Sequence, residues 1–397
     1  MSIKPHHISL QMGTMGAERC GWFQSRGDFR MPRSYSNAFA VRRSVPAMLL
    51  QIALGSTIIG IVGLTLVKSK AAKWAFNWFF MQIKYNAVAL RGIADDYLQA
   101  RNNKTDLPHM PNRVAIVTGG SRGIGLEIVK MLLKCDMHVI IACRRPEAGE
   151  KAIRAIRESG ITTGAPEVME LDNASLESVK RFVNEFKNNY QQLDILVNNA
   201  GIMFTPYAET KEGFEEQYGV NYLSHFYLTI LLTPLLRKAG TAEHCSRVVN
   251  VSSLAHLLGD IRFDDINHRD NFLTYEAYAQ SKLAQVLSTK SLAKNFDKEH
   301  WPIRINAVHP GLVSTDLFDH SYLRYFKFIA NVLFKTPAQG ATSIVFAAVD
   351  PRMEQNSGQY TSNCREVAVN PLVNNEALQD RLFQFSLKQV GLHTIPT

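Results

Sequence analysis

Cysteine is scarce in this chain of 397 residues, and the five that occur are widely separated. They stand at positions 20, 135, 143, 245 and 364, and none forms a CxxC pair. This pattern argues against a disulfide framework and against a zinc site, and it suits a reducing compartment. The chain also lacks low-complexity tracts and internal repeats beyond a strand–helix unit. We therefore expect an ordinary globular core and no bound metal.

Acidic residues are few in the first 112 residues, so the net charge of +9 is unevenly distributed. Arg42, Arg43 and Lys68 are among the many basic residues of this part, whereas the remainder of the chain is much closer to balance. The basic residues flank an apolar run, which favours anionic lipid over nucleic acid as the partner. We predict a membrane partner and no nucleic-acid partner.

The apolar run at 45–67 is twenty-three residues long and contains no charged residue. As a helix it would be about 34 Å long, enough to cross a hydrocarbon core of roughly 30 Å. A buried core helix and the apolar centre of a signal peptide are the alternatives, but no small-residue cleavage site follows. We predict a transmembrane helix at 45–67. Residues 1–44 mildly resemble a mitochondrial leader and are better interpreted as a disordered basic segment.

Residues 68–111 include a stretch that is aromatic on one side and carries Lys73, Lys84 and Arg91. This pattern is typical of an amphipathic helix at a membrane interface. A helix packed on the globular domain is almost as good an interpretation. We predict a juxtamembrane linker at 68–111 and a single globular domain at 112–397.

From Asn112 onward, short apolar runs alternate with helix-like segments such as GLEIVKMLLKC. The runs are rich in β-branched residues and almost free of polar alternation, as strands buried on both faces of a parallel sheet are. They read RVAIVTGG, MHVIIACR, PEVMELD, LDILVNNAG, SRVVNVSS and IRINAVHPG. The predicted fold class is α/β, a doubly wound and mostly parallel sheet of the Rossmann type.

The stretch TGGSRGIG, residues 118–125, follows the first of these runs and opens a helix. Its glycines allow a tight turn, close approach of the backbone to a pyrophosphate, and tight packing of the helix on the strand. A lone glycine pattern is a weak signal, but its place in the first strand–helix unit predicts a dinucleotide site. The predicted contacts in this loop are Gly119, Ser121, Arg122, Gly123, Ile124 and Gly125.

The second run ends in ACRRP, so Cys143 stands where an acidic residue would bind the ribose diol of NAD(H). Arg144 and the loop residue Arg122 could together attract a 2′-phosphate, which favours NADP(H) over NAD(H). The alternative is that Arg144 and Arg145 only begin a solvated helix. Asp172, after the third run, is a weaker candidate, which would accept a hydrogen bond from the adenine amino group.

Tyr278 and Lys282 lie four residues apart in YAQSK and therefore share one face of a helix. An ammonium group near a phenol favours the phenolate, so we expect the pKa of Tyr278 to be lowered. The tyrosine could then exchange a proton with a substrate oxygen. Either residue alone would more simply be a core or surface side chain, and the order of the other motifs supports the catalytic interpretation.

The order of the motifs resembles that of the short-chain dehydrogenase/reductase superfamily, over about residues 112–370. The motifs are the glycine loop, NNAG at 198–201, Asn221 in GVNYLSHF, Ser253 in VNVSS, the pair Tyr278 and Lys282, and HPGLVSTDL at 309–317. The resemblance implies that Ser253 bonds the substrate oxygen, that Asn221 holds a water in a proton relay, and that Lys282 binds the nicotinamide ribose. Ser252 is a rival for Ser253, and the SS pattern of the family favours the second serine. Further implied contacts to the nicotinamide half of the cofactor are Asn199, Gly201, Tyr278, Pro310, Gly311 and Thr315.

Ser253 and Tyr278 are 25 residues apart, about a dozen more than in most members. The extra segment resembles the retinol dehydrogenase-like branch. Within that branch, YAQSKLA and LFKTPAQGA look most like members associated with long-chain isoprenoid alcohols and aldehydes. The aromatic segment 317–335 lies where the family places a substrate-covering loop, although a core helix is an equal alternative. His256 and His309 each stand alone and are interpreted as structural.

We predict a membrane-anchored, NADP(H)-preferring oxidoreductase that interconverts a lipophilic alcohol with its aldehyde or ketone. Polyprenoid and retinoid substrates are favoured, with steroids as the rival class. The expected location is the endoplasmic reticulum with a cytosolic catalytic domain, and mitochondrial or lipid-droplet membranes are alternatives. A silent cofactor-binding scaffold and a lumenal carrier with a cleaved leader are the competing functions. A homodimer is compatible with the sequence.

Overall fold

The computed structural model describes residues 70–315, 317 and 333–396. The predicted transmembrane helix at 45–67 and the basic segment at 1–44 lie outside these residues, as does most of the aromatic segment 317–335. Within the described ranges, no helix combines the length and the apolar content needed to cross a bilayer.

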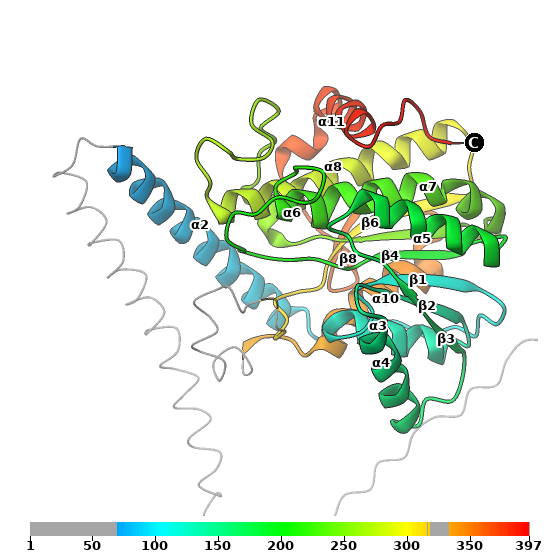
Figure 1. Cartoon of the computed structure of the whole chain (residues 1–397). Coiled ribbons are helices and arrows are strands. Elements are labelled where there is room, and N and C mark those ends of the chain that lie inside the picture. The colour runs from blue at the N-terminus through cyan, green and yellow to red at the C-terminus, as the bar shows by residue number, and fades with distance from the viewer. Residues whose placement is uncertain (1–69, 316, 318–332, 397) are drawn as a thin grey trace, which may run out of the picture. The chain divides into compact units, whose positions relative to one another are not determined.

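One eight-stranded sheet forms the centre of the described part of the chain (Figure 1). The strand order is β3-β2-β1-β4-β5-β6-β7-β8, and all neighbours are parallel except the antiparallel pair β7 and β8. This order winds outward in both directions from β1, as a doubly wound fold requires. The strands are β1 (Val114–Thr118), β2 (His138–Cys143), β3 (Ala165–Glu170), β4 (Ile195–Asn198), β5 (Ser246–Val251), β6 (Ile303–His309), β7 (Tyr360–Ser362) and β8 (Arg365–Glu366).

Helices cover both faces of the sheet, and the alternating side chains of β1 pack into two separate apolar clusters. Ile116 belongs to one cluster, whereas Ala115 and Val117 belong to the other. One layer contains α3 (Gly123–Lys134), α4 (Pro146–Glu158) and α10 (Pro337–Val349); the other contains α5 (Leu176–Asn189), α7 (Ser224–Ala239), α8 (Thr274–Lys298) and α11 (Glu376–Gln389). Short helical turns are α6 (Glu216–Tyr218), η1 (Gly219–Leu223), η2 (Leu254–Leu258), η5 (Pro351–Met353) and η6 (Pro371–Asn374).

The six predicted runs all form strands, but they are not equally buried. Every residue of β1 is buried, as predicted for a strand covered on both faces. In β3 only Met169 is buried. The expectation of burial on both faces is wrong for β3 because this strand forms the edge of the sheet, where one side has no neighbouring strand.

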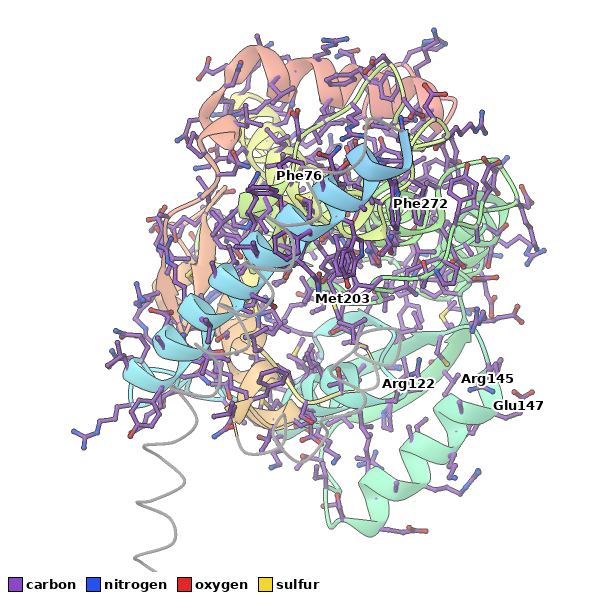
Figure 2. The ribbon with its side chains drawn as sticks, turned by 90° about the vertical axis from the view of Figure 1, so that its left-hand side faces the viewer. Phe76, Arg122, Arg145, Glu147, Met203 and Phe272 are labelled. Atoms are coloured by element: carbon purple, nitrogen blue, oxygen red, sulfur yellow. The ribbon has the colours of Figure 1, made fainter. Side chains whose placement is uncertain are left out.

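Helix α2 (Lys70–Leu98) lies along one side of this domain (Figures 1 and 2). The hydroxyl of Tyr85, in its middle, donates a hydrogen bond to the backbone oxygen of Tyr275 at 2.6 Å. The second half of α2 is therefore packed on the globular domain, the alternative that the sequence left open. Trp74 and Trp78, which are 46% and 40% exposed, give the first half an exposed aromatic surface. A role of this surface at a membrane stays a prediction.

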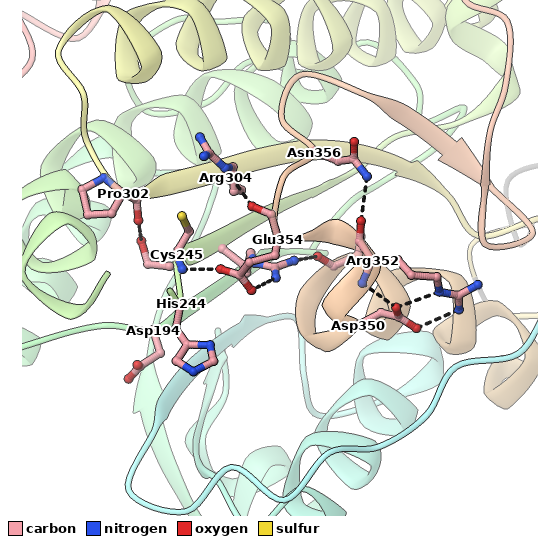
Figure 3. A network of polar contacts seen from close by, with 12 residues as sticks. Asp194, His244, Cys245, Pro302, Arg304, Asp350, Arg352, Glu354 and Asn356 are labelled. Atoms are coloured by element: carbon pink, nitrogen blue, oxygen red, sulfur yellow. Dashed lines mark hydrogen bonds and ion pairs between the residues drawn. The ribbon is translucent and has the colours of Figure 1, made fainter. Parts of the chain in front are cut away.

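Glu354 is bonded to residues at the amino ends of both β5 and β6 (Figure 3). Its carboxylate accepts from the backbone N–H of Cys245 and pairs with the guanidinium of Arg247, a side chain only 5% exposed. Its backbone oxygen accepts from Nε of Arg304 at 3.0 Å. This network holds the strand ends that lie opposite the carboxyl edge of the sheet.

Replacing Glu354 with Ala should lower the free energy of unfolding by about 3 kcal/mol, because it leaves the buried guanidinium of Arg247 without its carboxylate. Urea unfolding at neutral pH measures the change. The exposed pair Lys294 and Glu376 provides the control, and Lys294→Ala should change the free energy of unfolding far less. Equal losses in the two variants would show that the Glu354 network does not stabilise the strand ends.

Candidate active site

The carboxyl ends of the central strands bound two adjoining cavities. The first has a volume of about 180 Å³ and is lined by Ser253, Tyr278 and Lys282 together with Pro310 and Gly311. The second, of about 460 Å³, contains the remaining predicted cofactor contacts. The residues of this second set are Gly119, Ser121, Arg122, Gly123, Ile124, Gly125, Arg144, Asp172, Asn199, Gly201 and Thr315.

The wall between the two cavities is shared. Asn199, Gly201 and Thr315 line both of them, and Met203 does so as well. A molecule that fills the second cavity therefore reaches the groups that line the first. Asn221 lines neither cavity, although the sequence predicted it as part of the same set.

Tyr278 and Lys282 lie on one face of α8, as their spacing predicted. Nζ of Lys282 is 5.7 Å from the centre of the Tyr278 ring and donates to the backbone oxygen of Val251 at 3.0 Å. The Tyr278 side chain lines the first cavity together with Ser253 and is 4% exposed. Val251, the last residue of β5, thus holds the ammonium, and Ser253, two residues later, lies on the cavity wall with the phenol.

Burial acts on these two groups in opposite directions. It raises the pKa of Tyr278 to about 12, and the hydrogen bond to Ser253 lowers that pKa by a smaller amount. It lowers the pKa of Lys282 to about 7. The prediction of a lowered pKa for Tyr278 is wrong in this structure. Desolvation disfavours both charged forms, and an amine with this pKa is half neutral near pH 7 and does little to stabilise a phenolate.

Asn221 sits in the π turn η1 and connects two parts of the site. Its Oδ1 accepts from the backbone N–H of Ile202 at 2.8 Å, and its Nδ2 donates to Ser281 Oγ on α8 at 3.0 Å. Its backbone oxygen accepts from Nε2 of Gln285 at 2.8 Å. A π turn offsets the helical hydrogen-bond pattern and often marks a functional position. The predicted role in a water relay stays a prediction, and the contacts show a residue that joins the NNAG loop to α8.

The two serines differ in the direction of their side chains. Ser252 Oγ donates to the backbone oxygen of Lys282 at 2.9 Å and has a structural role. Ser253 faces the first cavity, beside Tyr278. His256 is buried, contacts the backbone oxygen of Ser253 through Nδ1 at 2.8 Å, and has its pKa lowered by burial to about 4. These contacts agree with the structural interpretation of that histidine.

Two glycines of the loop, Gly119 and Gly125, leave no room for a larger residue. A Cβ at Gly125 would lie 2.2 Å from the backbone oxygen of Gly119, and Gly119 itself has a φ of +66°. The loop leads directly into the amino end of α3, where free N–H groups favour an anion. Asn199 holds the loop in place through its Nδ2, which donates to the backbone oxygen of Thr118 at 2.8 Å. The residues present therefore fit the pyrophosphate of a dinucleotide.

Three arginines line the second cavity, where the sequence placed the adenosine end of the cofactor. Arg122 and Arg144 were predicted there, and Arg145, which the sequence left open as a solvated residue, also lines it. Figure 2 shows Arg122, in the glycine loop directly before α3, and Arg145 at the beginning of α4. Burial raises the pKa of the Cys143 thiol, so this position adds no negative charge. Asp172, the carboxylate that the sequence predicted near the adenine, lines the same cavity.

Sequence reasoning missed the part that α2 plays in the site. Tyr85 and Gln82 of α2 line the first cavity together with Tyr278. The Tyr85 ring lies 5.5 Å from that of Phe204 and 5.3 Å from that of Tyr275. The aromatic side of the 68–111 segment was the available signal, but it does not say which protein surface the aromatic residues contact.

Comparison with known proteins identifies the family. The family model described as short chain dehydrogenase matches residues 113–324. The chain belongs to this family. The polyprenol dehydrogenase of Danio rerio is 42% identical over 290 residues, which cover 72% of this chain and 89% of that protein. Human retinol dehydrogenase 14 is 36% identical over 300 residues, with 71% and 88% covered.

Solved structures agree with the fold. A protein from Mycobacterium paratuberculosis superimposes with a TM-score of 0.59 at 30% identity and covers 74% of this chain and 98% of its own. The Pseudomonas aeruginosa RhlG/NADP active-site complex gives a TM-score of 0.51 at 27% identity, with 64% and 95% covered. These similarities confirm the predicted superfamily and its retinol dehydrogenase-like branch. The protein is an NAD(P)-dependent short-chain oxidoreductase of the alcohol dehydrogenase type.

Lys282→Met should change the pH dependence of stability. The amine titrates near 10.4 in an unfolded chain and near 7 in the folded protein. Between these values the unfolded state binds more protons, so the stability of the wild type rises with pH, and the full penalty applies below pH 7. We expect the variant to be more stable at pH 7 by roughly 2–4 kcal/mol, with the difference shrinking toward pH 10.

Urea unfolding at a series of pH values measures this difference. Lys290→Met, on the less buried side of the same helix, is the control and should show no comparable trend. A constant difference between Lys282→Met and the wild type from pH 7 to pH 10 would contradict a neutral buried amine.

Proposed function

We propose that this enzyme prefers NADP(H) and interconverts a long-chain isoprenoid or retinoid alcohol with its aldehyde. The observation that carries the proposal is the first cavity, whose lining is predominantly apolar and aromatic apart from a few polar groups near Tyr278 and Ser253. Such a lining favours a lipophilic substrate with one polar end. The similarity to polyprenol and retinol dehydrogenases supports the same substrate class.

Tyr278 and Ser253 would act on the substrate oxygen from one side of this cavity. With a pKa of about 12, Tyr278 is protonated at neutral pH and can donate its proton as a carbonyl is reduced. Ser253 would stabilise the charge that develops on the same oxygen. A bound nicotinamide supplies or accepts the hydride. Lys282, with a pKa of about 7, exchanges protons readily near neutrality and could return one to the tyrosine.

The preference for NADP(H) is supported by charge in the second cavity. Arg122, Arg144 and Arg145 line it. Cys143 ends β2, where a carboxylate would otherwise bind the ribose diol and repel a 2′-phosphate. Guanidinium groups match the geometry of phosphate oxygens.

We further propose that the enzyme is anchored in the endoplasmic reticulum membrane, with this domain on the cytosolic side, and that it can form a homodimer. The uncharged run at 45–67 and the exposed Trp74 and Trp78 of α2 support the membrane part of this proposal. Aromatic rings of this kind favour the interface between lipid and water. A substrate dissolved in the bilayer would then be close to the α2 wall of the first cavity.

Substrate profiling of the full chain in lipid nanodiscs tests the proposed reaction. NADPH oxidation should be fastest with polyprenoid or retinoid aldehydes and slower with ketosteroids. Tyr278→Phe should lower kcat by about 1000-fold and leave NADPH binding nearly unchanged, because it removes only the proton donor. The control, Tyr207→Phe, changes an exposed tyrosine outside both cavities. NADPH binding without turnover of any carbonyl compound would instead support a silent scaffold.

Arg144→Asp tests the preference for the phosphate. The ratio of kcat/KM for NADPH to that for NADH should fall at least about tenfold, because a carboxylate would repel the 2′-phosphate and accept from a free ribose diol. Lys151→Asp makes the same change of charge on an exposed residue of α4 that lines neither cavity. Equal shifts in the two variants would mean that overall charge, and not contact by Arg144, sets the preference.

A further inference from the structure

A buried ion pair lies beside the first cavity and has no place in the proposed mechanism. Asp96, near the end of α2, and Lys335, just before α10, are 2.9 Å apart, and their side chains are 9% and 7% exposed. Both lie outside the residues that the family model matches, 113–324. A buried pair of this kind is costly to desolvate and therefore needs good geometry and further hydrogen bonds.

The further hydrogen bonds are made to the backbone of residues 310–312, called the PG segment below. Oδ2 of Asp96 accepts from the N–H of Leu312 at 2.9 Å, and Nζ of Lys335 donates to the backbone oxygen of Pro310 at 3.3 Å. Between them Gly311 has a φ of +94°, and a Cβ there would lie 2.7 Å from Oδ2 of Asp96. The two side chains thus enclose this segment so closely that only glycine fits.

Asn363 completes the network. It is fully buried, its Oδ1 accepts from Nζ of Lys335 at 2.6 Å, and its Nδ2 donates to Oδ1 of Asp96 at 3.1 Å. The ammonium of Lys335 therefore has three acceptors, one for each of its protons, in Asp96, Asn363 and the oxygen of Pro310. A polar network that is satisfied in this way is rigid.

The segment held by this network lines the active site. Pro310, Gly311 and Leu312 line the first cavity together with Tyr278. We propose that Asp96 and Lys335 are a positioning pair that holds this backbone in the conformation that receives the nicotinamide end of the cofactor. The inference rests on the dinucleotide cofactor of the family and does not depend on the proposed substrate.

The backbone at Lys335 is held by its own hydrogen bonds, so the path of the chain there does not depend on the Lys335 side chain. The N–H of Lys335 donates to the oxygen of Leu312 at 2.8 Å, and the N–H of Ser314 donates to the oxygen of Lys335 at 3.0 Å. This short parallel bridge does not use the Lys335 side chain. The chain can therefore keep its path when the charges are removed, whereas the PG segment loses its side-chain contacts.

Binding of whole and truncated cofactor to Asp96→Asn tests the pair. NADPH contains the nicotinamide half, whereas 2′,5′-ADP contains only the adenosine half. We expect the Kd of NADPH, measured by fluorescence, to rise about tenfold and the Kd of 2′,5′-ADP, measured by calorimetry, to stay within about twofold. Should NADH bind more tightly than NADPH, the same comparison is made between NADH and 5′-AMP.

Asp194→Asn is the matched control. Asp194 is also a buried carboxylate that pairs with an arginine and accepts from a backbone N–H, but it lies at the amino ends of β1 and β4. Its loss should lower stability without changing either Kd. Parallel weakening of NADPH and 2′,5′-ADP in folded Asp96→Asn, or an unchanged Kd for NADPH, would overturn the proposal.

The double variant Asp96→Asn/Lys335→Met keeps the test available if the single variant does not fold. It removes both buried charges, so it should regain much of the lost stability. NADPH should still bind about tenfold more weakly than to the wild type, because Pro310 has lost its donor. Recovery of both stability and NADPH affinity would show that the pair only stabilises the fold.

Discussion

The burial of Lys282 beside Tyr278 is the constraint on which the rest of the site depends. In water the two groups would be an ordinary ammonium and an ordinary phenol, whereas burial moves the pKa of the amine down to about 7 and that of the phenol up to about 12. The oxygen of Val251 at the end of β5 holds the amine in this environment. The end of β5 therefore holds the amine in place, and burial sets its pKa.

Several neighbouring contacts keep α8 in the position that this burial requires. Ser252 bonds the backbone oxygen of Lys282, and Asn221 bonds Ser281 through its side chain and Gln285 through its carbonyl. These bonds reach α8 from β5 and from the π turn before α7. A shift of α8 would break them together, so the position of the helix face that carries Tyr278 and Lys282 is set cooperatively.

The sequence predicts features that depend on residues close together in the chain. The burial of β1, the glycine loop and the shared face of Tyr278 and Lys282 follow from local spacing, and the structure contains all three, whereas the burial expected for β3 is wrong. The raised pKa of Tyr278 was not predicted, because desolvation depends on residues distant in sequence that cover the phenol. Strand β8 has two residues and is too short to leave a pattern. Asp96 and Lys335 are 239 positions apart in the sequence, and no local motif connects them.

Helix α2 shows why the family motifs alone do not make a complete site. They lie within residues 113–324, but Tyr85 lines the first cavity from outside that range, and Asp96 bonds the PG segment from the same helix. Without α2 the cavity would lose its Tyr85 wall, and Lys335 would be left as a buried charge without its carboxylate. The helix that the sequence placed next to a membrane is thus bonded to the backbone beside Tyr278. Through these bonds, α2 holds one wall of the first cavity and the backbone of Leu312 beside it.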